Sequence, residues 1–79
     1  MGTAFTKLQG RYLAFIAAYT KVNGRAPAEA DMQRYFRVTP PSVHQMILAL
    51  ERRGLITRTP GRARSIQVLV RGERLPALD

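Results

Sequence analysis

The sequence contains no cysteine and only one histidine in 79 residues. The absence of cysteine excludes a disulfide framework, thiol catalysis and thiolate metal sites, and a single histidine does not make a zinc site. No apolar run approaches the roughly 20 residues that a membrane-spanning helix needs. The first residues, Met-Gly-Thr-Ala-Phe-Thr, also lack the basic start and apolar run of a signal peptide. We therefore expect a cytoplasmic protein without a metal or another cofactor.

Acidic residues are also scarce, because five Asp and Glu face 13 Lys and Arg, which gives a net charge of +8. Such an excess implies a polyanionic partner, and nucleic acid comes ahead of an anionic membrane or a merely solubilising surface. Over residues 52–74 every basic residue is an arginine, and only Glu73 opposes them. Arginine forms bidentate bonds with phosphate and guanine, so this bias favours nucleic acid as the partner.

The sequence offers no pattern typical of an enzyme. Glu29 and Asp31 are a close pair of carboxylates, but they fall in the first turn of a predicted helix, where negative charge suits the helix dipole. The chain also has no nucleophile–base pair, phosphate-binding loop or metal cluster. We expect a protein that is not an enzyme.

The length allows one small domain. We expect a loose N-terminus over residues 1–5 and a domain over residues 6–70. Residues 71–79 are expected to form a flexible tail or a short docking segment.

The best-marked helix is predicted over residues 40–53. Thr39 is its candidate N-cap, two prolines occupy its first turn, and Gly54 ends it in a left-handed conformation. Apolar residues at positions 43, 46, 47 and 50 define its buried face. At about 100° per residue, Gln45 then points away from that face, with Ser42 and His44 on its flanks. The outward face is almost free of acidic charge.

Two further helices are predicted before this one. Thr6 and Gln9 form a capping box for the first, which ends at Asn23-Gly24. Gly10 inside that helix predicts a close approach by another helix. The second helix covers residues 28–36. The residues expected to face inward are Leu8, Tyr12, Phe15, Ile16 and Tyr19 in the first helix, and Met32, Tyr35 and Phe36 in the second.

The connection between the second and third helices has only three residues, 37–39, which predicts a helix-turn-helix. In this motif the second helix places its N-terminal residues in the DNA major groove.

After Gly54 the hydrophobic pattern changes from helical to alternating. Residues 55–59 are rich in β-formers, residues 60–63 form a turn, and residues 64–70 place alternate apolar side chains on one face. This predicts a β-hairpin with Arg62 and Arg64 at its tip. The expected fold class is α+β, a small winged helix-turn-helix of three helices followed by a two-stranded β-hairpin wing.

Several segments together resemble the DNA-binding domain of LexA-type repressors over residues 6–70. They are Tyr12–Gly24, Pro27, Pro41-Ser42-Val43-His44, Leu50-Glu51-Arg52-Arg53-Gly54-Leu55-Ile56 and Pro60-Gly61-Arg62-Ala63-Arg64-Ser65-Ile66. The resemblance implies a repressor that reads its operator from the start of the third helix and uses the wing as a second contact. It does not extend to the family's peptidase half, so we expect a short stand-alone relative or an excised domain without self-cleavage.

The sequence departs from the family pattern in the helix-turn-helix. Arg37 stands in the turn where that family usually has glycine, and a left-handed arginine costs about 1 kcal/mol or more. Gln33 stands where a small residue usually packs between the two helices.

The predicted DNA-binding residues divide into base readers and backbone contacts. Gln45 is suited to pair with adenine, and Ser42 and His44 are suited to other base edges. Thr39 and Arg52 are candidates for flanking phosphates, while Arg62 and Arg64 are candidates for the backbone or the minor groove.

The expected partner is double-stranded DNA. If the chain forms a homodimer, we expect a palindromic operator, and the homodimer is expected to be weak or to form only on DNA. The alternative is a winged-helix module that docks on an acidic protein surface, because fold alone does not settle function.

Overall fold

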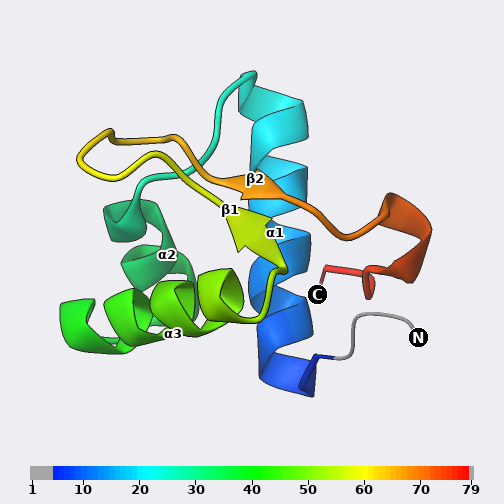
Figure 1. Ribbon diagram of the computed structural model, residues 1–79, viewed down its shortest axis with the longest axis horizontal. Helices are drawn as coiled ribbons and strands as arrows, with labels where there is room; N and C mark the ends of the chain where they lie inside the picture. Colours follow the sequence, from blue (N-terminus) through cyan, green and yellow to red (C-terminus); the bar gives the residue numbers. More distant parts are fainter. Residues whose placement is uncertain (1–4, 79) are drawn as a thin grey trace.

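The computed structural model describes residues 5–78 as three α-helices, a two-stranded hairpin and a short 3₁₀ helix (Figure 1). The elements are α1 (Lys7–Asn23), α2 (Glu29–Phe36), α3 (Pro40–Arg52), β1 (Ile56–Thr57), β2 (Gln67–Val68) and η1 (Gly72–Arg74). The predicted fold class is therefore confirmed. No helix in the described part of the chain has the length and apolar character needed to cross a membrane.

The first helix begins and ends as its sequence predicts. Thr6 Oγ1 accepts a hydrogen bond from the Gln9 N–H at 3.0 Å, and Gln9 Oε1 accepts one from the Thr6 N–H at 2.9 Å. Gly24 ends α1 in a left-handed conformation with φ of 75°. Leu8 was expected to face inward, but its side chain is 48 % exposed.

The turn between α2 and α3 contains the left-handed arginine that the sequence suggested. Arg37 has φ of 56° and ψ of 51°, and the N–H groups of Arg37 and Val38 both donate to the Gln33 carbonyl. Gln33 itself is half-buried. The turn thus keeps the left-handed geometry of a glycine turn with an arginine in place.

Both ends of α3 follow from its sequence, with one difference. Thr39 occupies the N-cap position, but its hydroxyl lies 3.0 Å from that of Ser42 and makes no hydrogen bond to the helix backbone. The two prolines that follow Thr39 have no N–H to offer. At the other end, the N–H of Gly54 donates to Glu51 and that of Leu55 donates to Leu50, both at 3.0 Å, which is the Schellman arrangement.

The core lies where the three helices and the hairpin meet. Leu13, Met32, Ile47 and Leu55 are all fully buried there, and each comes from a different part of the chain. The complete buried cluster is Tyr12, Leu13, Phe15, Ile16, Ala26, Met32, Val43, Ile47, Leu50, Leu55, Ile56, Ile66 and Val70. The predicted inward faces are therefore largely confirmed.

An aromatic cluster continues the core at the side of α1 and α2. Tyr12 stacks on Phe36 with ring centroids 4.0 Å apart, and Phe15 stacks on Tyr35 at 4.4 Å. Tyr35, expected to face inward, is 38 % exposed because it forms the outer edge of this cluster.

The hairpin is shorter than predicted. Ile56 pairs with Val68 and Thr57 pairs with Gln67 in an antiparallel register, and each strand has only two residues. Residues 58–66 form no further ladder, and within them Gly61 and Arg64 have φ of 75° and 56°, outside the strand region.

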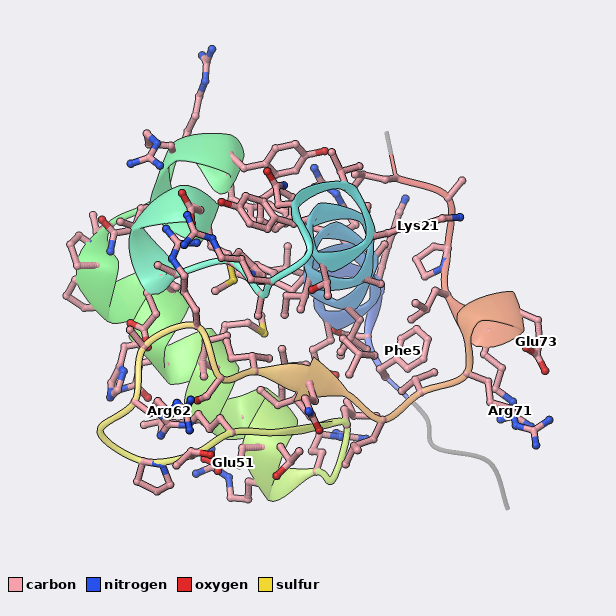
Figure 2. All side chains as sticks on the ribbon, turned by 90° about the horizontal axis from the view of Figure 1, so that it is seen from above. Phe5, Lys21, Glu51, Arg62, Arg71 and Glu73 are labelled. Carbon is pink, nitrogen blue, oxygen red and sulfur yellow. The ribbon has the colours of Figure 1, made fainter. Side chains whose placement is uncertain are left out.

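The two ends of the described chain lie against α1. A Cβ placed on Gly10 would lie 2.9 Å from Phe5 Cε1 and 3.2 Å from Pro76 Cγ. The close approach at Gly10 was therefore predicted correctly, but terminal segments make it and not another helix. Figure 2 shows Phe5 between α1 and the C-terminal segment, where Leu75 also packs against the core. Residues 1–4, which were expected to be loose, lie outside the described residues.

Candidate nucleic-acid interface

The outward face of α3 carries the polar side chains that the sequence assigned to it. Ser42, His44 and Gln45 are exposed, while Val43 and Ile47 on the opposite face are fully buried. Packing of the apolar face therefore fixes the direction of the polar one. A shallow depression beside this face is lined by Gln9, Pro41, Ser42, Gln45, Met46 and Ala49.

The start of α2 lies close to this face. His44 Nδ1 is 3.3 Å from Glu29 Oε2, which joins α3 to the first turn of α2. The side chains of His44 and Glu29 remain 50 % and 36 % exposed. A carboxylate therefore lies at the edge of the outward face, but it is matched by a histidine.

The carboxylates of the described residues are all engaged by basic side chains. Glu51 Oε1 accepts from Arg58 Nε at 3.1 Å, and Glu73 lies 3.5 Å from Arg71 (Figure 2). Glu29 faces His44, and Asp31 pairs with two arginines. Each of these carboxylates already has a basic partner. Because 13 Lys and Arg face five Asp and Glu in the sequence, these pairs leave an excess of positive charge that they do not neutralise.

The wing tip is shaped by one serine. Ser65 Oγ accepts the Thr59 N–H at 2.9 Å and lies within hydrogen-bond distance of the Thr59 and Arg62 carbonyl oxygens. The Arg62 N–H donates to the Thr59 carbonyl at 3.1 Å, and Gly61 supplies the left-handed conformation of the turn. The Arg62 side chain is exposed at this tip (Figure 2).

Arg64 has a different position from Arg62, although both were predicted at the tip. Its Nη1 atom lies 3.2 Å from the Tyr19 hydroxyl, 3.2 Å from the Ala26 carbonyl oxygen and 3.1 Å from Asp31 Oδ2. The side chain is only 30 % exposed. The structure therefore directs the Arg64 guanidinium into the body of the fold.

Asp31 is the acceptor that collects these contacts. Its Oδ2 accepts the Ala28 N–H at 2.8 Å, which caps α2, and its carboxylate also pairs with Arg34. The Ala28 N–H first, and the charges of Arg64 and Arg34 after it, lower the pKa of Asp31. Sequence reasoning missed this contact, because the three partners of Arg64 lie 33, 38 and 45 residues away and leave no local pattern.

Of the seven predicted site residues, four lie together, and Arg52, Arg62 and Arg64 each lie apart from them. Thr39, Ser42, His44 and Gln45 lie together over the first half of α3. Arg52 is exposed at the far end of that helix, roughly 18 Å from its start at 1.5 Å per residue. Arg62 lies on the wing, beside a cleft that also includes Ala28 and Glu29 at the start of α2. We call the outward face of α3, with Ser42, His44 and Gln45, the reading face. The wing and the reading face thus both border the start of α2.

Comparison with known proteins gives a consistent result. The sequence profile of the LexA DNA binding domain matches residues 2–65. The LexA repressor of Thermosipho africanus is 41 % identical over 68 residues, which cover 86 % of this chain and 34 % of that protein. The LexA repressor of Pseudothermotoga lettingae is 40 % identical over an alignment of 80 positions, which covers 99 % of this chain and 40 % of that protein. The chain thus spans about a third of the length of the curated relatives that it matches.

Proposed function

Because the chain belongs to the family of LexA DNA-binding domains, we propose that it binds double-stranded DNA sequence-specifically and represses transcription. The observation that carries this proposal is the exposed polar face of α3, which packing of Val43 and Ile47 holds in one direction. An α-helix presented in this way fits the major groove, where each base pair shows a distinct pattern of donors and acceptors.

The base readers in this proposal are three exposed side chains of α3. The Gln45 amide pairs with N6 and N7 of adenine, since it offers one donor and one acceptor side by side. Ser42 and His44 contact neighbouring base edges. The Glu29 contact uses Nδ1 of His44, so Nε2 is the ring nitrogen proposed to face DNA.

The backbone contacts come from both ends of α3 and from the wing. Thr39 and Arg52 reach phosphates that flank the reading face, and Arg62 reaches the backbone or the adjacent minor groove from the wing tip. Arg64 was predicted to share this role. Its contacts with Tyr19 and Asp31 argue for a role inside the protein.

Two copies of the chain bind a palindromic operator in this proposal, and they dimerise weakly or only on DNA. Half-sites one helical turn apart would let each copy place its α3 in the same face of the duplex. The alternative, docking on an acidic protein surface, receives less support, because the chain belongs to the family of LexA DNA-binding domains.

The test is fluorescence anisotropy with a duplex from upstream of the protein's own gene and with a scrambled duplex of equal length, across a salt series. We expect the native duplex to bind at least ~10³-fold more tightly and both affinities to fall with salt. Equal and weak binding of both duplexes at physiological salt would contradict sequence-specific recognition.

A further inference from the structure

The backbone at Arg64 is strained in a way that needs a compensating interaction. Its φ of 56° lies in the left-handed region, which an L-residue with a long side chain adopts at a cost of about 1 kcal/mol or more. Such conformations persist where the surrounding structure determines them strongly. The three polar contacts of the Arg64 guanidinium are the interactions available for this purpose.

These contacts tie the wing to two helices and to the segment between them. Tyr19 belongs to α1, Ala26 to the linker, and Asp31 to α2. The hairpin strands contribute only two residues each, so the ladder alone gives the wing little rigidity. Ile56, Ile66 and Val70 anchor the base of the hairpin in the core, and the Arg64 contacts attach the segment beyond its tip to the helices.

The same end of α2 also serves as a reference point for α3. Asp31 accepts the N–H of Ala28 at the start of α2, and Glu29 contacts His44 of α3. The wing, through Arg64, and the reading face, through His44, are thus both attached to the first turn of α2. A change at Asp31 or Arg64 is therefore expected to alter the angle between the two proposed DNA contacts.

We infer that Arg64 is a positioning residue: its bonds to Asp31, Tyr19 and the Ala26 carbonyl hold the wing so that Arg62 meets the DNA backbone while α3 occupies the major groove. Arg64 itself does not contact DNA. This inference rests on the proposed function, and it assigns the two wing arginines to different tasks.

The main test is a double-mutant cycle with Arg62→Ala and Arg64→Ala, in which the dependence of DNA affinity on salt is measured for each variant. Arg62→Ala is expected to weaken binding about tenfold and to lower the salt slope by about one, the change for one lost phosphate contact. Arg64→Ala is expected to give the same two changes, because the wing no longer delivers Arg62. The double variant should resemble either single variant.

Two results would overturn the inference. A double variant whose slope falls by about two, with additive losses of affinity, would mean that Arg64 contacts DNA directly. An Arg64→Ala protein with the wild-type slope would mean that Arg64 contributes only to folding. Melting curves identify folded variants, and Arg64→Lys, which keeps the charge but not the planar guanidinium, replaces Arg64→Ala if the latter does not fold.

Removing the charge of Asp31 gives an independent test through the sign of its effect. By simple electrostatics, any lost negative charge tightens binding to DNA. We expect Asp31→Asn instead to weaken binding severalfold, because it releases Arg64. Glu73→Gln is the matched control, since it removes one exposed carboxylate far along the chain and should bind as well as wild type or slightly better. An Asp31→Asn protein that binds more tightly than Glu73→Gln would contradict the inference.

A measurement without DNA separates this inference from the proposed function. Nitrogen-15 relaxation should show greater amplitudes of motion at residues 60–63 in Arg64→Ala than in Arg62→Ala or wild type. Unchanged relaxation would refute the role of Arg64 even if the protein binds its operator. Increased motion together with no specific DNA binding would refute the proposed function but would still support the role of Arg64 in holding the wing.

Discussion

α3 and the wing belong to the same proposed DNA surface, but different forces hold them in place. α3 is fixed by apolar burial, with Val43, Ile47 and Leu50 fully buried on its inner face. The base of the wing is buried in the same core, but its tip, beyond a ladder of only two residue pairs, depends on polar contacts of Ser65 and Arg64. We therefore expect the position of α3 to depend less on salt and pH than the position of the wing tip, which relies on a few charged and polar bonds.

The largest effect is expected from the apolar side of this comparison. Ile47→Ala removes a fully buried side chain from beneath α3 and should lower the free energy of unfolding by roughly 2–5 kcal/mol. Urea denaturation measures this change. Leu69→Ala is the control, because the Leu69 side chain is 56 % exposed and its truncation should cost far less. Equal losses in the two variants would show that burial does not anchor α3.

A smaller effect, on DNA alone, is expected from the outer side of α3. Gln45→Ala should change the preference for one base pair by about 1–3 kcal/mol and leave the melting temperature unchanged, since Gln45 is exposed. Binding to a set of duplexes with single base-pair changes measures this preference. Gln67→Ala, an exposed glutamine of the wing, should keep the wild-type pattern. Uniform weakening across all duplexes in Gln45→Ala would remove Gln45 from the base readers.

The turn between α2 and α3 tests whether a strained backbone lowers stability just before α3. Arg37→Gly should raise the free energy of unfolding by about 1 kcal/mol, because glycine adopts φ of 56° without a steric cost. Arg34→Gly introduces glycine inside α2, where it also removes the pair with Asp31, and should lower stability by about 1 kcal/mol or more. Thermal unfolding of both variants gives the two signs. A loss of stability in Arg37→Gly would mean that the Arg37 side chain makes a contribution larger than its backbone cost.

The smallest effect concerns pH and belongs to the wing. The pKa of Asp31 is lowered in the folded protein, so its ionised form contributes stability at neutral pH that is lost as pH falls through and below about 4. The difference in melting temperature between wild type and Asp31→Asn should therefore be largest near neutral pH and shrink in acid. Glu73→Gln, on an exposed pair, serves as the reference. A difference that stays constant down to acidic pH would contradict the assigned role of the Asp31 charge.

The sequence was most informative where structure is determined locally. The capping box of Thr6 and the stop at Gly54 fixed helix ends within a residue, because caps and turns depend on neighbours in the chain. The strands were predicted too long because alternation continues through residues 64–66, whereas the ladder stops at Gln67 and Arg64 beyond it has a left-handed backbone. No local rule indicates that an arginine takes this conformation.

The candidate site divides in the same way. The outward direction of Gln45 follows from the helical period and is seen in the structure, although its contact with DNA remains a prediction. The sequence did not indicate that Arg62 and Arg64 point to different places, because both are arginines two residues apart in the same turn. Only the distant partners Tyr19 and Asp31 distinguish them.

The two prolines at the start of α3 have a consequence for conformational entropy. Pro40 and Pro41 are restricted in φ before the chain folds, so the unfolded state loses less freedom when this end of α3 forms. The proposed reading face therefore begins at a point that is already rigid in the free protein. Less order has to be created when DNA arrives, so more of the contact energy of α3 is retained as affinity.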